Sequence, residues 1–278
     1  MAFSLSSLFG RDRPVVPVVR LSGAIGAVGG LRPGLSLAGV EAALAKAFAI
    51  KRAPAVALVI NSPGGAAVQS HLIFQRIRAL ADEKKKKVIV AVEDVAASGG
   101  YMIAVAGDEI VVDASSIVGS IGVLFAGFGF PKLMERLGIE RRVHTAGTSK
   151  SMLDPFSQEK TEDVERLKAL QEDVHGDFIA LVRSRRPNLA HDPELFTGAF
   201  WSGSRAVTLG LADRVGNLRS VLRQAYGDDV RLLPIRTERR GLLGRLRFAG
   251  AAVSAPAGLV DQVVSAVEER ALWSRFGL

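Results

Sequence analysis

The stretch KVIVAVEDVAASGGYMIAVAGDEIVVDA, residues 87–114, places a serine between a run of small residues and a Gly-Gly pair. Two runs rich in β-branched residues, 87–94 and 109–114, flank a segment with the character of a short helix, 99–108. Apolar runs of this length are typical of strands that are covered on both faces, as in a parallel sheet. Ser98 lies where the first strand ends, so it is either a nucleophile or a small residue at a tight turn.

The same alternation extends toward the N-terminus. Residues 15–26 and 55–65 have the pattern of strands, and residues 36–50 and 67–83 have apolar residues at helical spacing. Pro17 favours an edge strand or an early position within a strand, because proline cannot donate to a sheet ladder. This order predicts an α/β fold with a parallel sheet and flanking helices.

The C-terminal half is predicted to be mostly helical. Residues 157–185 should form one long helix, with a break at Gly176, and residues 195–227 a loop, a helix and a turn. Arginines alternate with leucines after residue 236, which predicts a basic amphipathic and helical C-terminal segment, 236–278. We therefore divide the chain into a flexible N-terminus (1–14), a main domain (15–235) and this segment.

Composition excludes several kinds of site. The chain has 278 residues, 48% of them hydrophobic, and no cysteine, so disulfides, thiolate catalysis and cysteine-based zinc sites are excluded. A net charge of +8 permits binding to acidic partners but identifies none, and the arginines form no stripe with aromatic residues, so we expect no nucleic-acid partner. No signal peptide and no membrane-spanning run is evident, which predicts a cytoplasmic protein.

A serine nucleophile needs a base and donors for the oxyanion. The G-x-S-x-G pattern of α/β-hydrolases fails because position 96 is Ala96. A Ser-His-Asp triad stays open as an alternative, with His144 nearest the other candidates. A lysine base must be neutral, which requires a pKa lowered from about 10.4 to about 7–8 in an apolar or hydroxyl-lined pocket. Lys150, in TAGTSKSMLDPF (145–156), has suitable small and hydroxylated neighbours.

The sequence INSPGG, residues 60–65, suggests the oxyanion donors. A buried strand ends there in Pro63-Gly64-Gly65, and glycines let backbone N–H groups approach a ligand closely. Loops at strand ends are where open α/β sheets place their sites.

Five motifs in a fixed order resemble one family. They are INSPGG, AASGGYMIA, VGSIGV, AGTSKSMLDPF and FTGAFWSGSRAVTLGLADRVG, within a resemblance that runs from about residue 15 to 225. Together they are similar to the signal peptide peptidase A and SohB family of serine peptidases. The resemblance implies a Clp protease/crotonase-like fold, a Ser-Lys dyad and a peptidase domain at 15–235.

The resemblance also implies roles for particular residues. Ser98 matches the nucleophile, Lys150 the general base, and Ser120 the hydroxyl that orients the lysine. Gly65 matches one oxyanion donor, and a backbone N–H at the Ser98-Gly99 turn would be the other. The family's single-repeat members form rings, which implies a homo-oligomer with a dyad formed across protomers.

Three features depart from the family pattern. Ser149 stands where many members have an aromatic residue before the lysine, no N-terminal membrane anchor is evident, and Trp201-Ser202 replaces a more polar helix start. The expected substrates are unfolded peptides or membrane-derived peptides such as signal peptides. The resemblance implies neither a metal nor an organic cofactor.

Two other functions stay open. One is a crotonase-like acyl-CoA enzyme, and the other is an inactive ring-forming scaffold. The basic segment after residue 236 could give peripheral contact with the inner membrane or pack on a neighbouring protomer.

Overall fold

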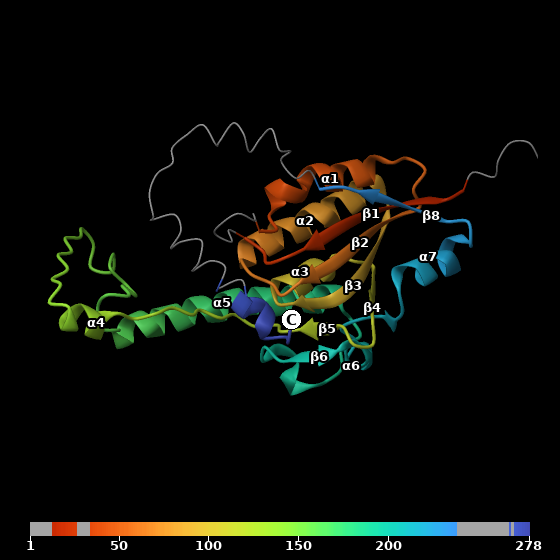
Figure 1. Cartoon of the computed structure of the whole chain (residues 1–278). Helices are drawn as coiled ribbons and strands as arrows, with labels where there is room; N and C mark the ends of the chain where they lie inside the picture. Colours follow the sequence, from red (N-terminus) through yellow and green to blue (C-terminus); the bar gives the residue numbers. More distant parts are fainter. Residues whose placement is uncertain (1–12, 27–33, 238–266, 268–269) are drawn as a thin grey trace, which may run out of the picture. The chain divides into compact units, whose positions relative to one another are not determined.

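The structure is a computed structural model that describes residues 13–26, 34–237, 267 and 270–278 (Figure 1). The chain divides into two compact units, which are treated separately below. The first comprises Met1–Ile121 and Leu181–Leu278, and the second comprises Gly122–Ala180.

The first unit is built on a mostly parallel sheet. Its strands are β1 (Val15–Ser22), β2 (Ala55–Ser62), β3 (Lys87–Ala97), β4 (Glu109–Val112), β5 (Ile117–Gly119), β6 (Phe200–Ser202), β7 (Arg214–Val215) and β8 (Arg231–Ile235). The order is β6-β5-β3-β2-β1-β8, with β4 paired to β3 and β7 paired to β4. Only the β5–β6 pairing among these strands is antiparallel.

The sheet interior explains the apolar runs of the sequence. Seven of the eight residues of β2 are buried, as a central strand covered on both faces requires. Pro17 is the third residue of β1, so it occupies the early position that the sequence allowed. The strand is not at an edge, because β8 pairs with it on one side and β2 on the other.

Helices of the first unit connect and cover these strands. They are α1 (Leu37–Ala49), α2 (Ala67–Lys84), α3 (Gly99–Ala104), a 3₁₀-helix η2 (Pro193–Phe196), α6 (Gly203–Thr208) and α7 (Leu218–Tyr226). Ser36 is the N-cap of α1, at the start of the helix predicted over residues 36–50. Figure 1 shows α1 and α2 side by side along the sheet.

The second unit contains the short helix α4 (Pro131–Arg136) and most of α5 (Thr161–Arg185). The predicted long helix is confirmed, although it starts at Thr161 rather than at Ser157. The predicted break at Gly176 is wrong, because α5 is continuous through that residue. A glycine inside a helix costs about 1 kcal/mol relative to alanine, which a helix of this length tolerates.

Two predicted terminal segments lie largely outside the described residues. Of the N-terminal stretch 1–14 only Arg13 and Pro14 are described, and of 236–278 only 236–237, 267 and 270–278. Among the helices that the structure describes, none has the length and apolar character needed to cross a membrane.

Candidate active site

Ser98 occupies a sharp turn between β3 and α3. Its backbone has φ 51° and ψ −122°, a conformation that residues with a side chain rarely adopt. Every other residue from 95 to 107 is buried, whereas Ser98 is partly exposed. The turn therefore presents one hydroxyl at the end of a buried strand, which is the strand-to-helix geometry of a nucleophile elbow.

Neighbouring segments hold this turn in place. The Ser98 N–H donates to the carbonyl of Gly119 at 2.8 Å, and its carbonyl accepts the first helical hydrogen bond of α3, from Met102, at 2.9 Å. Gly64 lies directly against Ser98, since a Cβ on Gly64 would be 2.8 Å from the Ser98 Cβ. Only glycine permits that approach, so the Pro-Gly-Gly loop forms one wall of the site.

Gly65 has an N–H group that is available to a ligand. The flanking groups are used: the carbonyl of Gly64 accepts from Ile25 N–H at 2.8 Å, and Ala66 N–H donates to Ile25 at 2.9 Å. The N–H of Gly64 donates to the Ser62 hydroxyl at 3.2 Å. Gly65 itself is exposed, and its N–H has no acceptor among the described residues.

Gly99 supplies a second unpaired N–H. It is the first residue of α3, where helical N–H groups have no partner within the helix. Although Gly99 is buried, no described residue accepts its hydrogen bond. Buried N–H groups without an acceptor are rare in native proteins, so a ligand atom is a natural partner for this one.

An irregularity in the sheet directs these loops. The register of β2 against β3 shifts between Ile60 and Ser62. At this point the Asn61 side chain accepts from Val95 N–H at 3.2 Å and donates to Asp94 at 2.6 Å. Bulges of this kind are frequent beside active sites, where they redirect the backbone.

Ser120 lies one residue beyond the carbonyl that binds Ser98. It is 5% exposed, has φ 53°, and donates its N–H to Ala199 at 2.7 Å. The first unit therefore brings Ser98, Ser120, Gly65 and Gly99 together through β2, β3 and β5. Neither serine hydroxyl is hydrogen-bonded within the described part of the chain.

Trp201 packs beside this group and was not given a functional role from the sequence. A Cβ on Gly119 would be 2.8 Å from the Trp201 ring, so the indole covers the backbone just before Ser120. The sequence showed Trp201-Ser202 as a departure from the family pattern. The position of Trp201 beside Gly119, however, depends on the antiparallel pairing of β5 with β6.

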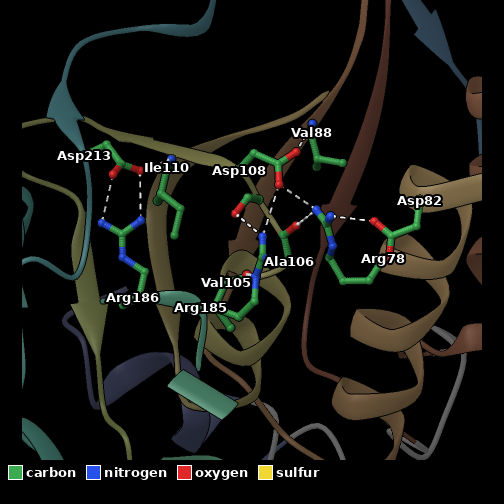
Figure 2. A network of polar contacts seen from close by, with 11 residues as sticks. Arg78, Asp82, Val88, Val105, Ala106, Asp108, Ile110, Arg185, Arg186 and Asp213 are labelled. Carbon is green, nitrogen blue, oxygen red and sulfur yellow. Dashed lines mark hydrogen bonds and ion pairs between the residues drawn. The ribbon is translucent and has the colours of Figure 1, made fainter. Parts of the chain in front are cut away.

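The far end of the helix that begins after Ser98 is capped by arginines (Figure 2). Arg185 donates to the carbonyls of Val105 and Gly107, both at 3.0 Å, and Arg78 donates to the carbonyl of Ala106 at 3.0 Å. Asp108 pairs with both guanidinium groups. Cations suit the carbonyl end of a helix, so this cluster fixes α3 from its C-terminus.

Tyr101 fixes the same helix from within. Its ring is fully buried, and its hydroxyl donates to the carbonyl of Leu211 at 2.8 Å. Burial raises the pKa of the Tyr101 hydroxyl, which keeps it a neutral donor at physiological pH.

Lys150 belongs to the second unit. It lies on an exposed turn, where its N–H donates to Gly147 at 3.2 Å. After this turn Asp154 pairs with Arg141 at 2.5 Å, and Leu153 N–H donates to Asp163, in α5, at 3.3 Å. Because Ser98 and Lys150 lie in different units, their pairing stays a prediction.

The described residues offer no group of three or more histidine, aspartate or glutamate side chains that could hold a metal ion. Around Ser98 the structure gathers two serine hydroxyls and two backbone N–H groups without an acceptor among the described residues, a combination that suits acyl transfer.

Comparison with solved structures identifies the fold. Two structures titled 1510-N membrane-bound stomatin-specific protease have a TM-score of 0.51 to this chain, at 16% and 15% identity. They cover 82% and 85% of this chain, which covers 100% and 97% of theirs. One is a serine-to-alanine mutant, and the other is a lysine-to-alanine mutant in complex with a substrate peptide. The fold is of the Clp protease/crotonase type, as predicted.

Curated relatives match over part of their length. A protein of Brucella abortus (strain 2308) named Na(+)/H(+) antiporter NhaA is 56% identical over 273 residues, 95% of this chain and 37% of the relative. Serine protease SPPA, chloroplastic, of Arabidopsis thaliana is 34% identical over 218 residues, 75% of this chain and 31% of the relative. The chain thus spans about a third of each.

The family model described as peptidase family S49 matches residues 81–229, which is more than half of the chain. This range begins within α2 and includes Ser98, Ser120 and Lys150. The chain therefore belongs to peptidase family S49.

Proposed function

We propose that the chain is an endopeptidase in which Ser98 is the nucleophile and Lys150 is the general base. The Ser98 Oγ forms a bond to the substrate carbonyl carbon while its proton passes to the lysine amine. The same proton then goes to the leaving amine as the peptide bond breaks, and water hydrolyses the acyl-serine ester. Ser120 would accept a hydrogen bond from the lysine and orient it.

The observation that carries this proposal is the turn at Ser98 with its two unpaired N–H groups. The hydroxyl is partly exposed, and Gly65 and Gly99 each have an N–H without an acceptor in the described chain. Two such donors beside a nucleophile are what a tetrahedral oxyanion needs, and losing one commonly costs about 10²–10³ in kcat.

A homo-oligomer would explain how Lys150 becomes a base. Its side chain is exposed in the single chain, and desolvation is one way to lower the pKa of a lysine so that it loses its proton near neutral pH. The second unit also exposes large apolar side chains, namely Leu124, Phe125, Phe128, Leu133, Leu137 and Ile139. Such patches mark interaction sites, and we propose that a second copy of this chain covers them and completes the dyad.

We propose unfolded and membrane-derived peptides as substrates, in keeping with the name of a relative from Enterococcus faecium, putative signal peptide peptidase SppA, which is 30% identical over 169 residues. The basic segment from residue 236 would give the enzyme peripheral contact with an anionic membrane. Co-sedimentation with anionic liposomes, compared with a chain ending at residue 236, tests that contact, and unchanged binding would contradict it.

A fluorophosphonate probe and a quenched peptide substrate test the chemistry. We expect labelling at Ser98, loss of labelling in Ser98→Ala, and loss of hydrolysis in Lys150→Met. Lys132→Met, a change at an exposed lysine of the same unit, is the matched control and should retain activity. Binding of acyl-CoA together with indifference to Lys150→Met would favour the crotonase-like alternative.

Complementation tests whether the dyad crosses protomers. Co-expression of Ser98→Ala and Lys150→Met chains should restore activity, because some interfaces then combine an intact serine with an intact lysine. Each variant alone should be inactive. A mixed oligomer without activity would show that serine and lysine must come from the same chain.

A further inference from the structure

The C-terminal residues 270–278 pack against the strands that end at Ser98 and Ser120. Phe276 is 8% exposed and forms an apolar cluster with Val95 and Ala97 of β3. Ile117 of β5 and Trp273 pack against this cluster. On the other side, the Phe276 ring meets Phe200 of β6 edge-to-face, with 5.1 Å between ring centroids.

These contacts connect three neighbouring strands. Val95 pairs with Ile117 and Ala97 pairs with Gly119 in the β3–β5 ladder, and Gly119 pairs with Phe200 in the β5–β6 ladder. Val95, Ala97, Ile117 and Phe200 are therefore on one face of the sheet, which we call the docking face. Phe276 spans this face from β3 to β6.

The docking face belongs to the least self-supporting part of the sheet. β5 and β6 have three residues each, and β6 is an edge strand at one end of the strand order. Ladders this short contribute few hydrogen bonds, so side-chain packing must hold the two strands in register. Phe276 and Trp273 provide that packing.

The register of β5 in turn sets the conformation of the nucleophile. Ser98 N–H donates to Gly119, and the positive φ of Ser98 is strained. A strained residue keeps its conformation only when its surroundings determine it fully. A shift of Gly119 relative to Ala97 would therefore release Ser98.

We propose that residues 270–278 of the same chain are a brace that docks on this face and holds Ser98 in its reactive conformation. Phe276 is then a positioning residue, because it acts through the backbone and touches no reacting atom. The effect on catalysis rests on the proposed peptidase function, whereas docking itself does not.

Kinetics of full-length variants test the brace. Phe276→Ala should lower kcat and the rate of fluorophosphonate labelling about 10- to 100-fold, the scale expected for a misplaced reacting group, with KM nearly unchanged. Phe276→Leu keeps an apolar side chain and should restore most of the rate. Leu278→Ala is the matched control, because Leu278 is 47% exposed in the same segment, and it should behave as the unaltered protein.

Hydrogen exchange tests the same step without using activity. In Phe276→Ala the amides of Ser98 and of residues 117–119 should exchange about tenfold faster or more, whereas those of β1 and β2 should not change. Exchange that is unchanged at Ser98, or raised equally through the whole sheet, would overturn the positioning role.

A peptide added in trans tests docking. Fluorescein-labelled RALWSRFGL, residues 270–278, should bind to the Phe276→Ala chain in an anisotropy titration and raise its kcat. The same peptide with alanine in place of its phenylalanine should do neither. Binding without hydrolysis in any form of the protein would leave docking standing and remove the proposed function.

Three results would overturn the proposal. They are a peptide that does not bind, a Phe276→Ala chain with full activity, and a Phe276→Ala chain that is more active and is inhibited by the peptide. The last result would mean that the segment blocks the site instead of bracing it.

Discussion

Replacing Ser98 with glycine should make the fold more stable while it removes the proposed nucleophile. The φ of 51° and ψ of −122° at Ser98 are close to the first central position of a type II′ turn, where glycine is the preferred residue. A side chain there is strained, so the native serine lowers the stability of the fold while it provides the hydroxyl for the proposed chemistry.

The size of the effect follows from two opposing terms. Relief of a residue in a sparsely populated conformation is worth about 1–3 kcal/mol. The greater freedom of glycine in the unfolded chain costs about 0.5–1 kcal/mol. The difference predicts a gain of about 1 kcal/mol in the free energy of unfolding, between limits of about 0 and 2.5 kcal/mol. Loss of the hydroxyl adds little, because it is not hydrogen-bonded within the described residues.

Ser98→Ala is the matched comparison, since it removes the hydroxyl and keeps the strained Cβ. Urea unfolding followed by circular dichroism should give a higher midpoint for Ser98→Gly than for Ser98→Ala, at similar slopes. Neither variant should react with a fluorophosphonate. Ser115→Gly, at an exposed residue without a positive φ, should lower the midpoint.

The reasoning fails if Ser98→Gly is no more stable than Ser98→Ala. That result would mean that the turn holds no strain at the serine, and the comparison with a nucleophile elbow would lose its energetic basis.

Three other changes follow from the site. Gly65→Ala would place a Cβ 2.2 Å from the carbonyl oxygen of Ile25, so peptide hydrolysis should fall at least about 10²-fold, and urea unfolding should show lower stability. Lys150→Arg retains a charge that cannot be lost, so kcat should fall about 10²–10⁴-fold with the oligomer intact by light scattering. Arg185→Lys loses the forked contact with the carbonyls of Val105 and Gly107, and Ser98 should then label more slowly at an unchanged melting temperature.

The parts of the fold that could be predicted are those with long, uniform patterns. The apolar runs in β2 and β3 are long enough to predict buried strands from the sequence. The length of α5 likewise gives a clear helical period. Ser98 could be selected only together with Lys150 and the other ordered motifs, because a strand that ends in Ser-Gly-Gly is by itself equally consistent with a small residue at a tight turn.

The short strands could not be predicted. β5, β6 and β7 have two or three residues each, which is too few to show any period. β8 contains Pro234, a residue that argues against a strand, and its position beside β1 comes from contacts between the two ends of the domain. Such pairings are tertiary, and local sequence contains no signal for them.

The site divides in the same way. Gly65 and Ser98 are recognisable as types, but the fact that Gly64 is closed to ligands depends on a hydrogen bond to Ser62 that only the folded loop makes. The surroundings of the Lys150 amine are harder to predict from the sequence, because the side chain is exposed in the single chain. The proposed cover for that amine is a second copy of the chain, which no local sequence pattern indicates.

The proposed serine site lies in the first unit and Lys150 in the second, so assembly could control the activity. The proposed nucleophile and both proposed oxyanion donors lie within the first unit, so a strained serine and two N–H groups without an acceptor among the described residues are present in every folded chain. If Lys150 becomes a base only when a second copy desolvates it, a lone chain has a prepared but unactivated serine, since a hydroxyl without a base is a poor nucleophile. Activity would then depend on assembly and not on refolding of the site. A peptidase with broad specificity for unfolded peptides would thus stay inactive until its oligomer forms.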